Sequence, residues 1–245
     1  AALQSAAYAL AALVQVATWA ALSLAASIRP RREAARVRQA IALDQTFQLK
    51  FQGRRSFDFL LDDADLRREE TVFLLNIPVS DSWRVPLERA GYRFLRAAGP
   101  SDLAREGARV PWAILASSLR AAASALFSKA GLEERQAFFR CLKARLCWSA
   151  INERVRFDHY IYANREDSSQ IALNAAMRRS GTLSWYYSLF FGGGLILSRD
   201  GDARKHRHVL WAYLNSDRFL GINDEALAAM KASTQAVRRY EAIGS

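Results

Sequence analysis

The sequence predicts an α/β protein in which a Rossmann-like parallel sheet is flanked by helices and preceded by an apolar amino-terminal helix. Three observations predict this class. From about Ala40 onward, short apolar runs alternate with helical patterns, as they do in parallel βαβ units. No internal repeat or low-complexity linker interrupts the alternation. Residues 1–28 carry no charged side chain and are long enough for one helix.

The first segment, residues 1–28, is alanine-rich and runs directly into the basic sequence RPRREAARVR. As a helix it would be roughly 40 Å long, enough to cross a bilayer core of about 30 Å. A membrane anchor or interfacial helix, a packing helix and a signal peptide all fit this pattern. We favour the anchor or interfacial helix, with the arginine flank on the cytoplasmic side. Residues 29–39 are then expected as a basic linker and residues 40–245 as the Rossmann-like domain.

The later elements are recognised by apolar periodicity and by residues that end helices and strands. Pro78 stops the buried run TVFLLNIP, Gly91 stops the helical segment SWRVPLERAG, and a serine start and glycine stop bound SSQIALNAAMRRSG. The other expected helices are residues 111–155, HRHVLWAYLN and DEALAAMKASTQAVRRY. The other expected strands are IALDQTFQLKF, YRFLRAA, FDHYIYAN, TLSWYYSLFF, DRFLGIN and EAIGS.

The formal net charge is +11, carried mainly by arginine. Such a surface suits anionic partners: acidic lipid, nucleotide diphosphates or phosphorylated acceptors. A solvated basic surface without a ligand fits the charge equally well. No zinc-finger, RNP or recognition-helix signature is present, so we expect no nucleic-acid partner.

Cysteine and histidine usage argues against a metal centre or a disulfide. Cys141 and Cys147 lie six residues apart in a helical pattern and so point to different faces. There is no CxxC or zinc spacing, and three histidines are too few for a histidine-built site. His159 falls inside an expected strand and is expected in or near the core. We therefore expect neither a metal nor a cofactor.

Ligands of open parallel sheets bind beyond the carboxyl ends of the strands, and this rule selects the loop ANREDSSQ. Asn164 and Arg165 end a predicted buried strand, and Arg165 could clamp a phosphate. Glu166 or Asp167 could act as a general base toward a hydroxyl group. Asp167 also fits a plain helix N-cap, a position where aspartate is strongly preferred.

A second candidate loop holds three consecutive glycines after the strand TLSWYYSLFF. Gly192, Gly193 and Gly194 match neither GxGxxG nor a Walker loop, which disfavours dinucleotide binding. Without a Cβ they would let a sugar or phosphate approach the backbone, and they would equally serve a tight turn or bulge. Ser188 and Asn223 complete the expected substrate-binding set.

The order of segments resembles the amino-terminal half of bacterial surface-polysaccharide biosynthesis proteins with a GT-B-like, two-Rossmann-domain layout. The resemblance covers roughly Arg54 to Ser245. It is carried by RRSFDFLLDD, TVFLLNIP, YANREDSSQIALNAAMRRSGTLSWYYSLFFGGG, LWAYLNSDRFLGIN and YEAIGS.

The resemblance implies a metal-independent glycosyltransferase at the cytoplasmic face of the bacterial inner membrane. It would transfer sugar from a nucleotide-sugar donor, held mostly by a second domain, to a glycan or lipid-linked acceptor. Carried over by position, Glu166 or Asp167 and the Gly192–Gly194 loop would face the interdomain cleft. Because the chain does not begin with Met and stops at YEAIGS, we expect it to be part of a longer protein. A non-catalytic domain that recruits anionic glycan or lipid to a membrane is the alternative.

Overall fold

The computed structural model describes most of the secondary structure that the sequence predicts. The described residues are 2–28, 35–43, 67–75, 85, 88–89, 91–96, 108–163, 168–187, 215–221, 224, 227–228, 231 and 237–242.

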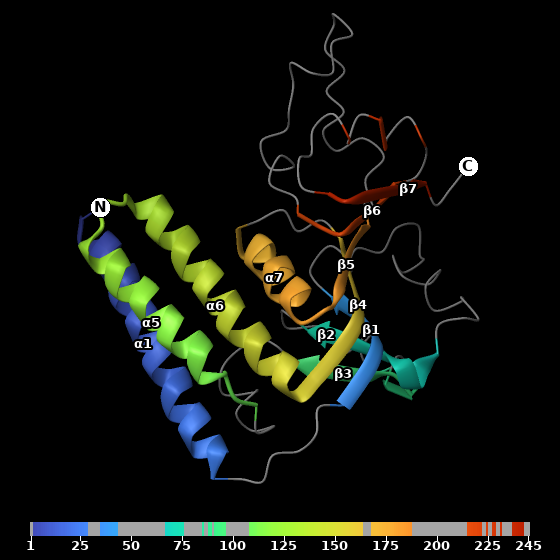
Figure 1. Cartoon of the computed structure of the whole chain (residues 1–245), viewed down its shortest axis with the longest axis horizontal. Coiled ribbons are helices and arrows are strands. Elements are labelled where there is room, and N and C mark those ends of the chain that lie inside the picture. Colours follow the sequence, from blue (N-terminus) through green and yellow to red (C-terminus); the bar gives the residue numbers. More distant parts are fainter. Residues whose placement is uncertain are drawn as a thin grey trace, which may run out of the picture.

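The described residues form a seven-stranded parallel sheet with the order β3-β2-β1-β4-β5-β6-β7 (Figure 1). This confirms the predicted Rossmann-like α/β class. The strand order is that of a doubly wound sheet, which grows outward in both directions from two central strands, β1 and β4. The strands are β1 Ala35–Leu43, β2 Thr71–Leu75, β3 Arg93–Arg96, β4 Val155–Ala163, β5 Leu183–Tyr187, β6 Arg218–Gly221 and β7 Arg239–Ala242.

Three strands, β1, β4 and β7, begin earlier than the sequence pattern indicates, and β4 starts at Val155, two residues before the predicted strand FDHYIYAN. β1 starts at Ala35, inside the range 29–39 that was expected as a linker. There Arg36 is solvent-exposed and pairs with Asp158, while Val37 is buried, so the arginines occupy the exposed side of a real strand. β7 starts at Arg239, two residues before the predicted strand EAIGS. In all three cases exposed arginines at the start of the strand gave the sequence the pattern of a linker or a helix.

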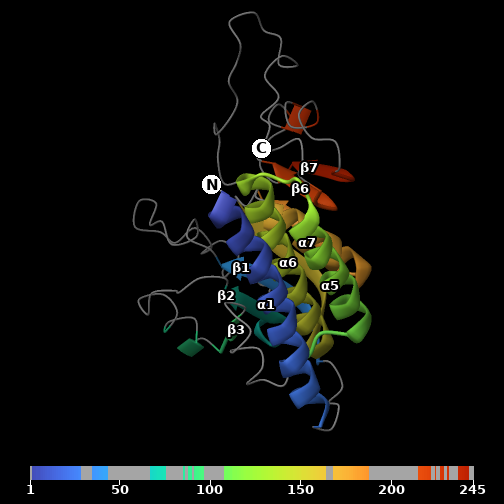
Figure 2. The same cartoon turned by 90° about the vertical axis from the view of Figure 1, so that its left-hand side faces the viewer.

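The helices cover one side of the sheet in two layers (Figure 1). α6, Leu132–Arg154, and α7, Ser168–Arg179, lie nearer the sheet. α1, Ala2–Ser27, and α5, Trp112–Phe127, lie farther out (Figure 2). A short 3-10 helix, Arg68–Glu70, leads into β2.

Helix boundaries follow local chemistry. At the start of α6 the Glu134 carboxylate accepts a hydrogen bond from the Gly131 backbone N–H at 2.7 Å, which satisfies a donor that the helix leaves open. At the end of α7, Thr182 N–H donates to Met177 O at 3.0 Å, and Gly181 N–H donates to Arg178 O at 3.2 Å. Gly181 has a φ of 83°, so this is a Schellman ending that glycine makes accessible. The predicted glycine stop is confirmed.

A row of aromatic rings crosses the face of the sheet that the helices cover. Neighbouring rings lie between 5.2 and 5.9 Å apart, centroid to centroid. At such distances aromatic pairs add specific contacts to the apolar area that they bury. The row links α6 to the edge of the sheet through Trp148, Tyr160, Tyr162, Tyr186, Phe219 and Tyr240.

The predicted amino-terminal helix is present as α1, and one of its faces is part of the core. Trp19 is fully buried, and Ala12 and Val16 belong to the same core cluster as the sheet residues. Ser23 Oγ accepts a hydrogen bond from Val110 N–H at 2.9 Å, just before α5. By length and composition this helix could cross a membrane, and it also packs as a helix of the domain.

Candidate functional site

The strand order locates the edge of the sheet at which a ligand would bind. From β1 the chain proceeds outward to β2, and from β4 it proceeds outward to β5 on the other side. The carboxyl ends of these two central strands, Leu43 and Ala163, therefore flank the point where the direction of winding reverses. Doubly wound sheets bind ligands in the crevice outside this point. The amino terminus of α7, at Ser168, follows β4 by only four residues and begins at the same edge.

The residues predicted from the sequence to contact substrate follow β4, β5 and β6 in the sequence, and all of them lie outside the described residues. They remain predictions; the structure describes the strands and helices that carry their loops. The residues are Asn164, Arg165, Glu166, Asp167, Ser188, Gly192, Gly193, Gly194 and Asn223.

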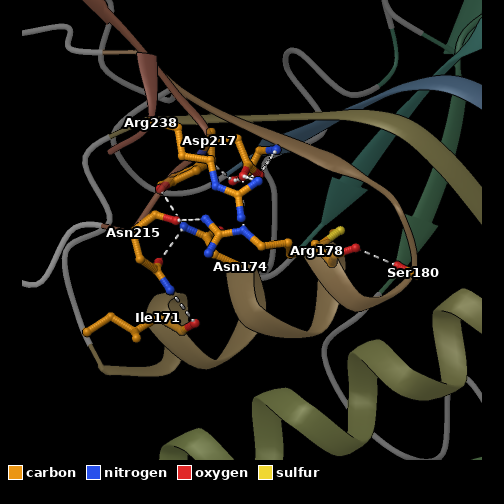
Figure 3. Close-up of polar contacts among 10 residues, drawn as sticks. Ile171, Asn174, Arg178, Ser180, Asn215, Asp217 and Arg238 are labelled. Atoms are coloured by element: carbon orange, nitrogen blue, oxygen red, sulfur yellow. Dashed lines mark hydrogen bonds and ion pairs between the residues drawn. The ribbon is translucent and has the colours of Figure 1, made fainter. Parts of the chain in front are cut away.

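A buried polar network, which we call the α7 network, holds α7 against the sheet. Its first part centres on Asn174, which is 1% exposed. Asn174 Nδ2 donates to Tyr162 Oη at 2.7 Å and to Asn215 Oδ1 at 3.0 Å. Asn174 Oδ1 accepts from Gln170 Nε2 at 2.8 Å, and Asn215 Nδ2 donates to the Ile171 carbonyl at 3.2 Å. Figure 3 shows Asn174 and Asn215 facing each other between α7 and the chain that leads into β6.

The second part of the α7 network centres on Asp217, whose side chain is 4% exposed. Its Oδ1 accepts from Arg178 Nε at 2.9 Å, and Arg238 lies 3.5 Å away as a second cation (Figure 3). Its Oδ2 accepts from both the backbone N–H and the hydroxyl of Ser184, each at 3.0 Å. Arg178 also donates to the Asn215 carbonyl at 2.7 Å. A buried charge is tolerated when it is paired with an opposite charge and hydrogen-bonded, and the carboxylate of Asp217 meets both conditions.

These contacts make the α7 network a positioning device. Both oxygens of Asp217 are occupied by partners of the chain itself, so they do not face a substrate. Burial raises the pKa of the Tyr162 hydroxyl, which keeps it protonated. Because the network reaches from Gln170 in the first turn of α7 to Arg178 in the last, it fixes the whole helix relative to β4, β5 and β6. It thereby sets where the helix begins at the ligand-binding edge.

Sequence reasoning did not find this network. Asp217 was read only as the beginning of the strand DRFLGIN, and Asn174 and Arg178 as ordinary residues of a helix. The sequence feature that could have indicated the network is NSDR, in which Asn215 and Asp217 stand directly before a strand. That signal does not name the partners, because Ser184 lies 33 residues away from Asp217.

A second group of polar and aromatic side chains is half-buried on the strands β4 to β7. Trp185 Nε1 donates to His159 Nδ1 at 3.1 Å, and the Arg218 guanidinium lies 4.4 Å from the Trp185 ring centroid. Arg218 pairs in turn with Glu241 at 2.6 Å. Burial lowers the pKa of His159, and the nearby Arg38 and Arg218 act in the same direction, while Asp158 opposes them. Nδ1 is therefore free of a proton and accepts the tryptophan hydrogen bond.

In the part of the chain that the structure describes, no cluster of side chains could serve as a metal site. No group of three or more His, Cys, Asp or Glu side chains that could hold an ion occurs there. Cys141, which is half-buried, and Cys147, which is buried, do not form a disulfide.

The strand order defines the chain as a Rossmann-like α/β protein in which the direction of winding reverses at the β1–β4 junction. Comparison with protein-family models, with curated proteins and with solved structures finds no match to the chain. Its function must therefore be argued from the edge itself.

Proposed function

We propose that this chain is the acceptor-side half of a membrane-associated glycosyltransferase of bacterial surface-polysaccharide biosynthesis. The observation that carries the proposal is the β1–β4 junction, where β4 leads through residues 164–167 into the amino terminus of α7. A phosphate of a sugar donor suits such a position, because the exposed N–H groups at a helix start favour anions. The basic charge of the chain and the order of segments support the same substrate class.

In the proposed reaction, an acceptor hydroxyl attacks the anomeric carbon of a nucleotide sugar. A bond forms between the acceptor oxygen and that carbon, and the bond from the carbon to the phosphate oxygen breaks. The hydroxyl proton passes to the carboxylate of Glu166 or Asp167, and the nucleotide diphosphate leaves with the bonding electrons. Arg165 neutralises part of the charge on the departing phosphate. Asn164, Ser188, Asn223 and the Gly192–Gly194 loop contact the acceptor, while a second domain holds most of the donor.

The test uses the complete protein and measures nucleotide release from a panel of nucleotide-sugar donors. The double variant Glu166→Gln/Asp167→Asn should lose on the order of a hundredfold in turnover, because general-base catalysis contributes that much. The matched control is Glu69→Gln/Glu70→Gln. It removes two adjacent carboxylates immediately before β2, at the opposite edge of the sheet, and should leave turnover unchanged.

The two possible failures point to different conclusions. Unchanged turnover in the double variant would remove the carboxylates from the mechanism and leave the transferase assignment in place. Absence of nucleotide release from every donor tested would refute the transferase. The chain would then be better described as a non-catalytic domain that recruits anionic glycan or lipid to a membrane.

A further inference from the structure

The outer helical layer exposes apolar side chains that a solvent-facing layer ordinarily lacks. Eight large apolar side chains are exposed among the described residues, and all except Leu183 belong to α1, to α5 or to Ile28 just after α1. Phe127 is 88% exposed and Trp112 is 58% exposed. Apolar exposure concentrated on one surface marks a site of protein or membrane interaction. The exposed side chains of this surface are Leu10, Val14, Leu24, Ile28, Trp112, Leu119 and Phe127.

Both helices keep one face in the core and turn the other outward. In α1 the buried positions recur at helical spacing from Ala9 to Ala26, and the exposed Leu10, Val14 and Leu24 occupy another side. In α5, Leu115, Ser118 and Ala122 are buried at helical spacing, while Trp112 and Phe127 are exposed outside this buried stripe and Leu119 is exposed at its flank. Figure 2 shows α1 and α5 in front, with α6 and α7 behind them. We call the exposed apolar surface of α1 and α5 the outer face.

Contacts with the rest of the domain argue that α1 does not cross a bilayer. Gln136 Nε2 donates to Tyr8 Oη at 3.1 Å, and the rings of Tyr8 and Phe139 lie 6.0 Å apart. These contacts join α1 to α6 near its amino terminus, and Trp19 and Ser23 hold it farther along. A spanning orientation would expose this inner face and break these contacts. An orientation in the plane of the membrane surface preserves them all.

The charges around the outer face identify its partner. No acidic residue occurs in residues 1–28 or in α5, and the acidic Glu133 and Glu134 follow at the start of α6. The exposed Arg120 lies within α5, and the exposed Lys129 follows Phe127 by two residues. Basic side chains beside an apolar surface are attracted to anionic lipid headgroups. A second copy of the chain would bring the same positive charges together, so lipid complements the outer face better.

We propose that the outer face of α1 and α5 docks the domain onto an anionic lipid surface, with α1 lying in the interface and not spanning it. Trp112 and Phe127, one at each end of α5, insert among the headgroups and the upper acyl chains. Arg120 and Lys129 pair with lipid phosphates. This inference does not depend on the chain being a transferase, since it concerns the side of the domain on which the helices lie.

The test measures binding of the 245-residue chain to vesicles of phosphatidylcholine, with and without phosphatidylglycerol, by co-sedimentation. The wild-type chain should bind the anionic vesicles more strongly, and added salt should weaken this preference. The double variant Trp112→Ser/Phe127→Ser should bind the anionic vesicles on the order of a hundredfold more weakly. It lacks the two large apolar side chains whose transfer from water into the lipid would stabilise the bound state. Leu183→Ser is the matched control, because it removes the one exposed large apolar side chain outside the outer face among the described residues.

A second variant keeps the test decisive if the first folds poorly. Arg120→Glu/Lys129→Glu changes only exposed charges, and it should weaken binding to anionic vesicles by on the order of tenfold while leaving binding to neutral vesicles unchanged. Wild-type behaviour of both double variants would overturn the proposal, as would failure of the wild-type chain to bind. Resistance of the bound chain to extraction by alkaline carbonate would show that α1 spans the membrane. A dimer in sedimentation velocity that Trp112→Ser/Phe127→Ser dissociates, without vesicle binding, would assign the face to a second copy.

Discussion

Replacing Asp217 by alanine is the most direct test of the α7 network. The substitution removes the acceptor of the buried Ser184 N–H and the partner of the Arg178 guanidinium. A buried N–H without an acceptor costs about 1–3 kcal/mol. Removing one member of a buried ion pair costs about 3–5 kcal/mol, but Arg178 is 32% exposed and keeps the Asn215 carbonyl, so about 1–2 kcal/mol is appropriate here. We therefore expect Asp217→Ala to lower the free energy of unfolding by about 3 kcal/mol.

The assay is urea unfolding at equilibrium, followed by far-ultraviolet circular dichroism. A loss of this size is a large part of the 5–15 kcal/mol by which domains are usually stable. The matched control is Asp158→Ala. It breaks an aspartate–arginine pair at a similar distance, 3.0 Å, whose side chains are 39% and 79% exposed. Exposed pairs of this kind contribute at most about 1 kcal/mol. If the two variants lost the same small amount of stability, the network would not be holding α7 in place.

Two further predictions follow from burial. Because burial lowers the pKa of His159, the unfolded chain binds a proton that the folded chain does not, so stability should fall as the pH drops below about 6.5. In His159→Gln the glutamine side chain can still accept the hydrogen bond from Trp185. This variant should show a smaller decrease of the urea midpoint than the wild type between neutral and mildly acidic pH. A decrease as large as that of the wild type would show that other groups cause the pH dependence. Burial also raises the pKa of the Cys147 thiol to about 11, so iodoacetamide at about pH 8 should modify Cys141 in the folded protein and both cysteines in urea. Mass spectrometry that found Cys147 modified as fast as Cys141 before unfolding would contradict its burial.

Elements that local patterns specify were predictable from the sequence, and the interiors of α5, α6 and α7 and of β2 to β6 agree with prediction. Glycine stops at Gly91 and Gly181 have positive φ, a conformation that glycine adopts without strain. The start of β1 was missed because Arg36 and Arg38, read as a run of charge, are exposed strand positions of a two-residue period. The clustered arginines masked the alternation of exposed and buried residues that is typical of a strand. The pairing of this segment with β4 shows that it is one.

The orientation of α1 and the α7 network could not be predicted for a different reason. Both faces of α1 are apolar, so its sequence contains no polar stripe to indicate which face is buried. The partners of Asp217 come from α7, β5 and the chain before β7, and no local pattern joins them. The loop residues from Asn164 to Asp167 lie outside the described residues and remain predictions.

The order of α1 and α6 in the sequence has a consequence for biosynthesis. Ser27 ends α1, whereas α6, its largest packing partner, is complete only at Arg154. At the usual rate of about 5–20 residues per second, roughly 6–25 s of translation separate these two points. During that interval the inner face of α1, which includes Trp19, cannot yet pack against the completed α6. The nascent helix can therefore contact the membrane or a chaperone before it can pack against α6. The order of these contacts determines whether the inner or the outer face of α1 is buried first.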